Sequence, residues 1–279
     1  MNDSPPPNDP YRNPYPANSA NDRQDDFGRD PLDGPPLPPP NQPRAIIFEP
    51  QAERPLVTYV IIGITVLVYI GQMIGETFLG GDIVAYYGMK INEFIRAGEL
   101  WRLFTPMLLH GSLLHIGFNM YALNVLGPEL EKQMGHIRFL LLYVVAGFAG
   151  NVFSLIFSTA PSLGASTSIF GLLAAQGVFV YQNREIIGSR AQAVLRSILT
   201  IAGINFFIGL SPGIDNWGHL GGFIGGAMFM WLAGPLLTAE STFPVIRLRD
   251  TREDPDGFRA LLSVGLIFVL LAGWSIVFQ

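Results

Sequence analysis

The sequence predicts an all-α fold, a polytopic bundle of transmembrane helices. Of the 279 residues, 49% are hydrophobic and 14% are charged, whereas a soluble domain carries about 25% charged residues. The mean hydropathy is +0.34 although the N-terminal part of the chain is polar, so apolar residues are concentrated in the remainder. Apolar segments recur there at close to the ~20 residues that a helix needs to cross a bilayer core.

Composition also limits the kinds of functional site that the chain can form. The chain has no cysteine and four histidines, so we expect no disulfide, no metal centre and no cofactor. No basic cluster with interleaved aromatic residues suggests a nucleic-acid partner. The lipid bilayer is therefore the first expected partner of this chain.

Residues 1–54 are predicted to form a disordered, proline-rich cytoplasmic tail. The first 50 residues hold 14 of the 22 prolines and few aliphatic side chains. Such a segment cannot bury enough apolar surface to offset the entropy of ordering it. It has no apolar stretch after Met1, so we do not interpret it as a signal peptide. A solvated tail and a ligand for a proline-binding partner remain open.

Seven apolar segments follow the tail. They are residues 56–75, 113–130, 137–157, 166–181, 193–210, 217–237 and 260–278. We expect the first six to form a core over residues 55–238, followed by a cytoplasmic linker over 239–258 and an additional C-terminal transmembrane helix over 259–279. The second and fourth segments carry polar residues, which are costly at membrane depth unless they face the bundle interior or water.

Basic residues predict how the bundle is oriented. If the N-terminus is cytoplasmic, 14 of the 17 lysines and arginines lie on the cytoplasmic side, in agreement with the positive-inside rule. The other three lie in the first outer loop, residues 76–112, whose apolar and polar mixture suits either an interfacial segment or an ordinary folded loop. We expect a multi-pass protein of a bacterial inner membrane, with Ser166 near the outer side.

The second apolar segment carries a polar face at its start. His115 and Asn119 lie four residues apart, so they share one side of a helix, and His110 precedes them. Imidazole and carboxamide groups on an apolar helix indicate either a functional site or hydrogen bonds that hold helices together. This segment alone does not decide between them.

The fourth segment begins with a serine that follows a glycine. Ser166 comes two residues after Gly164, at the start of a predicted helix. A serine there is typical of a helix cap. It is also well placed for chemistry, because the amides and the positive dipole end of a helix can stabilise an oxyanion.

The sixth segment combines a histidine with regularly spaced glycines. Gly218, Gly222 and Gly226 recur every four residues, and His219 follows the first of them. Small residues at that spacing let two membrane helices approach closely. A serine, a histidine and an asparagine at similar depth supply a nucleophile, a general base and an oxyanion donor.

Together these segments resemble the signatures of the rhomboid intramembrane proteases, in the family's order and spacing, from about residue 99 to 232. The residues that carry the resemblance are Trp101-Arg102 with Thr105-Pro106; His110, His115 and Asn119; Glu129-Leu130-Glu131 with Gly135; Gly164-Ala165-Ser166 with Ile169-Phe170-Gly171; and His219 with Gly222 and Gly226.

The resemblance implies a six-helix rhomboid-like core and a serine endopeptidase that cleaves transmembrane helices of membrane-protein substrates with a Ser-His dyad. Ser166 would be the nucleophile and His219 the general base. Asn119 and His115, with the Ser166 amide, would stabilise the oxyanion, and Phe170 would stack on the histidine. The family's structural residues would correspond to Arg102, Glu131, Gly164, Gly222 and Gly226.

Two positions depart from the family pattern, and other functions remain. Thr167 stands where many members have glycine, and Gly218 where alanine is common. Because the family uses a dyad, Asp215 receives no catalytic role.

A catalytically inactive relative that binds membrane clients, or a transporter with a polar path through the bundle, remains an alternative. No His-Glu-x-x-His zinc motif and no Gly-x-Gly-Asp segment occurs. The substrate, its cleavage site and the oligomeric state are not predicted.

Overall fold

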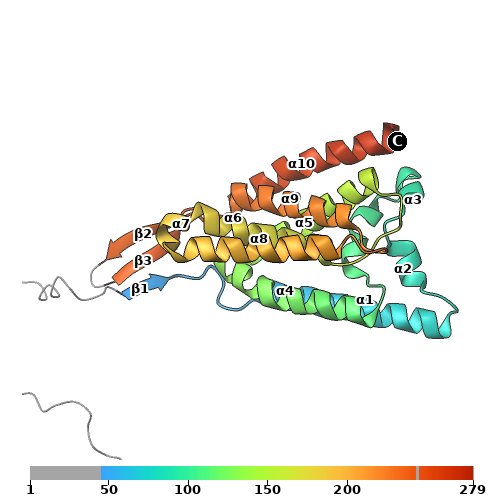
Figure 1. Ribbon diagram of the computed structural model, residues 1–279, viewed down its shortest axis with the longest axis horizontal. Coiled ribbons are helices and arrows are strands. Elements are labelled where there is room, and N and C mark those ends of the chain that lie inside the picture. The colour runs from blue at the N-terminus through green and yellow to red at the C-terminus, as the bar shows by residue number, and fades with distance from the viewer. Residues whose placement is uncertain (1–44, 243–244, 279) are drawn as a thin grey trace, which may run out of the picture. The chain divides into compact units, whose positions relative to one another are not determined.

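The computed structural model describes residues 45–242 and 245–278, which form a bundle of helices joined to a small sheet (Figure 1). The helices are α1 (Leu56–Phe78), α2 (Ile83–Gly88), α3 (Asn92–Arg96), the 3-10 helices η2 (Leu100–Leu103) and η3 (Thr105–Leu108), α4 (Leu113–Met134), α5 (His136–Phe157), α6 (Ser166–Gln182), α7 (Arg184–Ile187), α8 (Arg190–Ile208), α9 (Asn216–Ala233) and α10 (Asp254–Phe278). The strands are β1 (Ala45–Phe48), β2 (Leu237–Thr242) and β3 (Val245–Asp250).

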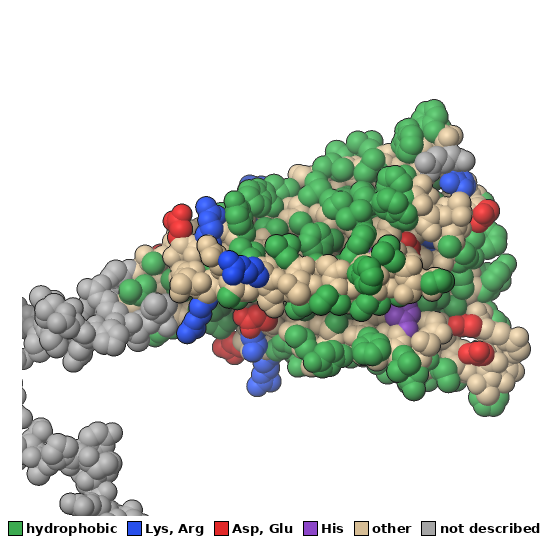
Figure 2. All heavy atoms as spheres, viewed as in Figure 1, with side chains coloured by type: hydrophobic (Ala, Val, Ile, Leu, Met, Phe, Trp, Pro, Cys, Tyr) green, Lys and Arg blue, Asp and Glu red, His purple; other side chains and the backbone are tan. Residues whose placement is uncertain are grey.

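The predicted helical membrane bundle is confirmed, because each of the seven apolar segments corresponds to one of the long helices. Within the described residues, four helices are long and apolar enough to cross a membrane: α1, α5, α8 and α10. On the face shown in Figure 2, apolar side chains cover the helices and most Lys and Arg side chains gather near the sheet. This distribution is the one expected of helices that face lipid.

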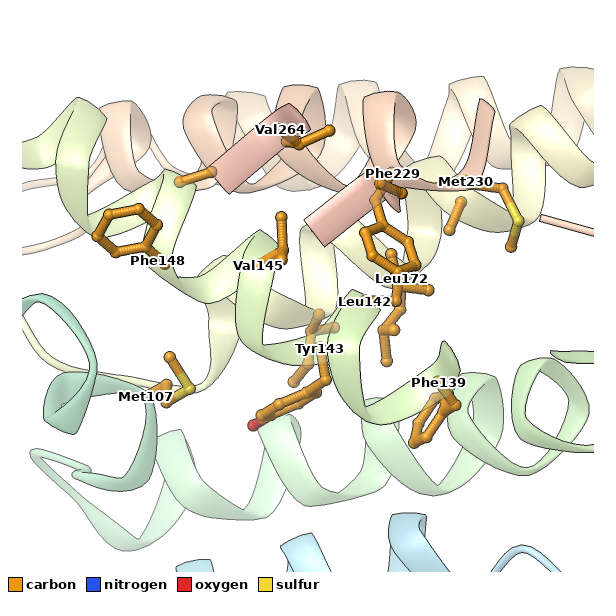
Figure 3. Packing of buried hydrophobic residues seen from close by; sticks show 14 of the residues in the cluster. Met107, Phe139, Leu142, Tyr143, Val145, Phe148, Leu172, Phe229, Met230 and Val264 are labelled. Carbon is orange, nitrogen blue, oxygen red and sulfur yellow. The ribbon is translucent and has the colours of Figure 1, made fainter. Parts of the chain in front are cut away.

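Helix α5 occupies the centre of the bundle. Its apolar stretch is 72% buried, against 22% for α1, 11% for α8 and 22% for α10. Figure 3 shows Leu142, Tyr143 and Val145 of α5 packed with Leu172 of α6 and Phe229 of α9. Three helices of the core, α5, α6 and α9, therefore form its most tightly buried part.

Glycines bring α9 unusually close to α6. A Cβ atom added to Gly222 would collide with the main chain of Thr167, and one added to Gly226 would collide with the main chain of Gly171. On another face of α9, Gly221 approaches α5 equally closely. Lipid supplies no hydrophobic drive between helices, so close van der Waals packing through small residues is what holds them together.

The buried carboxylate of Glu131 caps the start of α1. Its two oxygens accept hydrogen bonds from the amides of Val57 and Thr58, at 2.7 and 2.8 Å, and from the Thr58 hydroxyl at 2.6 Å. The first amides of a helix have no partner within it, and a negative charge is favoured at that end. Glu131 therefore fixes α1 to the end of α4.

Arg102 organises the long loop between α1 and α4. Its side chain is 1% exposed and donates to the carbonyls of Tyr86 and Met89, both at 2.8 Å, while Nε pairs with Glu99 at 2.7 Å. A guanidinium group offers five donors in a fixed plane, so one residue can hold several segments. The loop is thus a folded unit built from α2, α3, η2 and η3.

The same loop closes the C-terminal end of α5. The Lys90 ammonium group donates to the carbonyls of Ser158 and Ala160, both at 2.9 Å, and Asn92 donates to the carbonyls of Leu155 and Ser158. Burial lowers the pKa of Lys90 to about 8. These contacts satisfy carbonyls that have no partner at the end of a helix.

The sheet corrects the predicted limit of the N-terminal tail. Strand β1 pairs in parallel with β3, and β3 pairs antiparallel with β2, in the order β1-β3-β2. Residues 45–54 therefore belong to the described fold, and the rest of the predicted tail, residues 1–44, lies outside the described residues. The short run Ala-Ile-Ile-Phe at 45–48 favours a strand, but the proline content of the whole block obscured it.

The segment predicted as a linker, residues 239–258, has regular structure. It contains most of β2, all of β3 and the start of α10 at Asp254. Helix α9 ends at Ala233 because Gly234 and Pro235 follow, and proline cannot continue a helix. A buried ion pair of 2.7 Å between Arg138 of α5 and Asp250 of β3 fixes the sheet to the core.

We expect Gly222→Ala to destabilise the bundle by about 1–3 kcal/mol, the usual cost of overpacking a tight contact. The added methyl group has no space between α9 and the main chain of α6. The free energy of unfolding in mixed detergent micelles measures the effect. Gly265→Ala on α10 is the matched control, because a Cβ there meets nothing within 4 Å. Equal stabilities for the two variants would show that the α6–α9 contact is not tight.

We expect Glu131→Gln to cost about 2 kcal/mol, because charge-assisted hydrogen bonds to the amides of α1 are lost. Glu129→Gln is the control. It makes the same change two residues away on an exposed side chain of α4 and should stay within about 0.5 kcal/mol of the unmodified chain. The same unfolding measurement compares them, and equal losses would argue against the capping role.

Candidate active site

Ser166 begins α6 directly after a tight turn at Gly164. Gly164 has φ of 136°, a conformation that favours glycine, and a Cβ there would lie 2.8 Å from the His115 ring. Its amide donates to the carbonyl of Pro106 at 2.9 Å. The residue at the cap position is Ala165, and no side chain caps this helix. Ser166 is therefore not a helix cap, which was the structural interpretation of this position.

His219 lies in the first turn of α9, opposite Ser166. The Asp215 side chain caps the helix by accepting from the Gly218 amide at 2.9 Å. The distance between His219 Nε2 and Ser166 Oγ is 2.9 Å, within which the hydroxyl can donate to the ring. His219 Nδ1 is buried and has no hydrogen-bond partner among the described residues. The arrangement is thus a pair, and Asp215 serves its helix.

The Phe170 ring fixes the plane of the imidazole. It lies one turn after Ser166 on α6 and stacks on His219, with ring centres 4.3 Å apart and planes 10° from parallel. An imidazole held on one face by an aromatic ring loses rotational freedom without forming another hydrogen bond. This stacking keeps Nε2 directed toward Ser166.

His115 and Asn119 of α4 face the same space. Both line a cavity of about 770 Å³ together with Ser166 and His219. Within the described residues, the Asn119 carboxamide forms no hydrogen bond with another residue. For Asn119, the alternative in which this polar face holds helices together therefore lacks the bond it requires.

The cavity opens between α4 and α8. Phe118 and Tyr121 of α4 are 72% and 70% exposed, and Ile208 of α8 is 53% exposed; all three line the cavity. In Figure 2 a histidine side chain is visible in a hollow between two apolar surfaces. Exposed apolar side chains of α4 and α8 therefore form part of the wall of the cavity that contains Ser166.

A buried glutamine that the sequence analysis did not consider supports the site. The Gln72 side chain of α1 accepts from the His110 amide at 3.0 Å and donates to the His110 carbonyl at 3.1 Å. The His110 ring in turn packs against the His115 ring at 4.9 Å and accepts, at 3.5 Å, from the Ala165 amide. Gln72 thus connects α1 to the turn that presents Ser166.

The signal for Gln72 was present in the sequence. A carboxamide in an otherwise apolar span is costly unless it has partners, which marks it for attention. Its partner is the backbone of a loop 38 residues away, and no residue pattern predicts such a contact. Of the other predicted site residues, Arg102, Glu131, Gly222 and Gly226 lie outside the cavity lining and act through the packing described above.

Comparison with known proteins agrees with these features. Residues 97–236, half of the chain, match the family model of the rhomboid domain. The chain is 37% identical over 177 residues to rhomboid protease GluP of Bacillus subtilis, which covers 63% of this chain and 34% of that protein. It is 38% identical over 150 residues to RHOMBOID-like protein 1 of Arabidopsis thaliana, which covers 53% of this chain and 38% of the relative.

The chain therefore matches only about a third of the length of these curated relatives. The matched part is the part that contains Ser166, His219 and the helices that hold them. On the match of half its length to the rhomboid domain, this multi-pass membrane protein belongs to the rhomboid family.

Proposed function

We propose that the protein is an intramembrane serine endopeptidase that cleaves transmembrane helices of other membrane proteins. The observation that carries the proposal is the 2.9 Å contact between Ser166 Oγ and His219 Nε2, inside a cavity that exposed side chains of α4 and α8 help to line. Serine is a weak nucleophile at neutral pH and needs an adjacent base. Histidine is suited to that task because it can take up and return a proton near working pH.

The reaction follows from this geometry. His219 Nε2 takes the hydroxyl proton as Ser166 Oγ attacks the carbonyl carbon of the scissile peptide bond. The imidazolium then gives that proton to the leaving amine as the C–N bond breaks, which leaves an acyl ester on Ser166. Water, deprotonated by the same imidazole, attacks the ester; the imidazolium returns that proton to Ser166 Oγ as the ester C–O bond breaks, which releases the new carboxyl end.

Three donors suit the oxyanion of this reaction. The Ser166 amide lies at the start of α6, where amides have no partner within the helix and the dipole favours negative charge. The Asn119 carboxamide and the His115 ring face the same cavity. Donors already directed at the developing charge need no reorganisation during the reaction, and this accounts for much of the rate enhancement of many enzymes.

We infer the substrate class from the side chains of α4 and α8 that line the cavity around Ser166. A helix buries its carbonyls in intrahelical hydrogen bonds, so a transmembrane substrate must unwind locally before Ser166 can reach one. We propose that such a segment enters between α4 and α8. We also propose, from the distribution of basic residues, that the end of the bundle near the sheet faces the cytoplasm of a bacterial cell.

The other two interpretations have less support. An inactive, client-binding relative would not need a hydroxyl and an imidazole in hydrogen-bond contact beneath a stacked aromatic ring. A transporter would use His115, Asn119 and His219 as a polar path, yet all three line one cavity together with Ser166, and His219 contacts that serine.

A fluorophosphonate probe tests the nucleophile. We expect the detergent-purified protein to be labelled covalently, and expect Ser166→Ala to abolish both labelling and cleavage of a transmembrane substrate. His219→Ala should lose both as well, because the hydroxyl then lacks its base. Ser168→Ala is the matched control: this serine lies two residues further along α6, is fully buried and does not line the cavity. Labelling of the Ser166→Ala protein, or none of the folded unmodified protein, would refute the assignment.

Phe170→Leu tests the stacking. Leucine keeps the apolar contact but removes the flat ring above His219. Aromatic stacking contributes about 0.5–1.5 kcal/mol beyond buried area, so we expect kcat/KM for substrate cleavage to fall about 2- to 10-fold. The free energy of unfolding, measured alongside, separates this effect from a loss of fold. An unchanged kcat/KM would mean that the ring does not orient the base.

A further inference from the structure

Lys90 is a fully buried lysine in the loop between α1 and α4. Its side chain is 0% exposed, and its ammonium group donates to the carbonyls of Ser158 and Ala160, both at 2.9 Å. Moving a charged ammonium group out of water is costly even when hydrogen bonds compensate part of the loss. A neutral side chain at this position would avoid that cost, so the buried charge calls for a role beyond closing the end of α5.

The backbone of Lys90 holds the same stretch of chain. Its amide donates to the Ser162 carbonyl at 2.9 Å, and the Ser162 amide donates to the Lys90 carbonyl at 3.1 Å, so that the two residues form an antiparallel bridge. The Asn92 side chain adds bonds to the carbonyls of Leu155 and Ser158. Lys90 therefore holds the connection between α5 and α6 at residues 158, 160 and 162. We call residues 158–163 the wall segment.

The wall segment forms part of the active-site cavity. Pro161, Ser162 and Leu163 line the cavity that contains Ser166, and so does Met89, the residue before Lys90. Lys90 itself does not line the cavity. A change at Lys90 therefore reaches a bound substrate only through the segments that Lys90 holds in place.

The Ser166 turn has an anchor of its own. The Gly164 amide donates to the carbonyl of Pro106 at 2.9 Å. The 2.9 Å contact between Ser166 and His219 depends on the packing of α6 against α9. Because neither contact involves Lys90, loosening the wall segment leaves the two reacting side chains together.

We propose that Lys90 is a positioning residue for substrate binding, whose ammonium group holds the wall segment where a substrate in the cavity meets it. The inference rests on the proposed protease function, because it concerns the cavity around Ser166. Hydrogen bonds from a charged donor are roughly twice as strong as neutral ones, so the charged form of Lys90 holds the wall segment most firmly. A segment that is already ordered adds to affinity, because ordering it on binding would cost free energy.

Burial also makes the charge of Lys90 sensitive to pH. It lowers the pKa of Lys90 from 10.5 to about 8. Of the charged groups around the ammonium, Asp215 and Glu93 raise this pKa and Arg96 lowers it. The charged form is therefore present at pH 7 and largely lost at about pH 9. Since the unfolded chain keeps this proton up to a higher pH, the contribution of Lys90 to the free energy of unfolding rises over the same range.

Lys90→Met tests the positioning role, because it removes the donors and keeps a side chain of similar length. We expect KM for cleavage of a transmembrane substrate in proteoliposomes at pH 7 to rise about 3- to 10-fold, the ratio that corresponds to ordering one interface side chain. The kcat value and the rate of fluorophosphonate labelling of Ser166 should stay unchanged. Lys132→Met is the matched control: it makes the same change at the other lysine of the chain, which is exposed on α4, and should leave KM as it is.

The pH profile gives a readout that a general structural role would not produce. In the unmodified chain, we expect KM to rise between pH 7 and pH 9 toward the value of Lys90→Met, while Lys90→Met keeps one KM over this range. The free energy of unfolding in mixed micelles, taken relative to Lys90→Met, should rise over the same range. Weaker substrate binding together with higher stability separates the positioning role from a loss of fold.

Hydrogen–deuterium exchange examines the wall segment without relying on activity. At pH 7, Lys90→Met should speed exchange in the peptide that contains residues 158–163, and Lys132→Met should not. If Lys90→Met does not fold, Lys90→Gln takes its place, because its amide can donate without carrying a charge. We expect its KM at pH 7 to equal that of the unmodified chain at pH 9.

Three results would overturn the proposal. The first is an unchanged KM or an unchanged exchange rate of the wall segment in the folded Lys90 variant. The second is an equal loss in kcat and in labelling rate, since this would mean that Lys90 acts on the dyad or on the whole fold. The third is a pH dependence of KM that persists in Lys90→Met. Failure of the unmodified chain to be labelled would refute the proposed function instead, and the exchange measurement would still decide whether Lys90 holds the wall segment.

Discussion

The close contact between α6 and α9 is the constraint on which the rest of this structure depends. Gly222 and Gly226 allow the backbones of the two helices to touch, because any side chain there would meet the main chain of α6. Only at that separation do Ser166 at the start of α6 and His219 in the first turn of α9 come within 2.9 Å. Backbone packing between the two helices thus determines the geometry of the site, and its polar groups need few hydrogen bonds to hold them in place.

Buried polar residues hold the other elements around this pair. Glu131 caps α1, Arg102 organises the loop after it, and Lys90 closes the end of α5. Each of them forms hydrogen bonds with backbone groups that have no partner within their own helix or loop. Leaving such groups without partners is costly where water is excluded. These residues keep α1 and the loop in place, and through Gln72 and His110 they support the turn before Ser166.

Much of the fold and of the candidate site could be predicted from the sequence, because both leave local signals. The membrane spans were visible as apolar segments of sufficient length. Polar residues within such a span are costly unless they have partners, and they therefore indicated where the site lies. The spacing of Gly218, Gly222 and Gly226 predicted a close helix contact, although not which helix it meets. The resemblance to a known family then assigned roles to individual residues.

The features that were missed depend on contacts between distant parts of the chain. Strand β1 exists because four residues after a proline-rich block pair with β3, about 200 residues later. The ion pair between Arg138 and Asp250 links residues 112 positions apart. Neither the strand pairing nor the ion pair produces a periodic pattern in the sequence. Both are also hidden when composition is averaged over the surrounding segment.

The reaction rate of Ser166 with a fluorophosphonate in the Gly226→Ala variant is the most direct test of the central claim. Gly226 lies two turns from His219 and does not line the cavity, so its only route to the dyad is the spacing of α6 and α9. We predict labelling slower by about tenfold or more in the folded variant, corresponding to the usual cost of overpacking. A folded Gly226→Ala protein that reacts as fast as the unmodified chain would contradict the account.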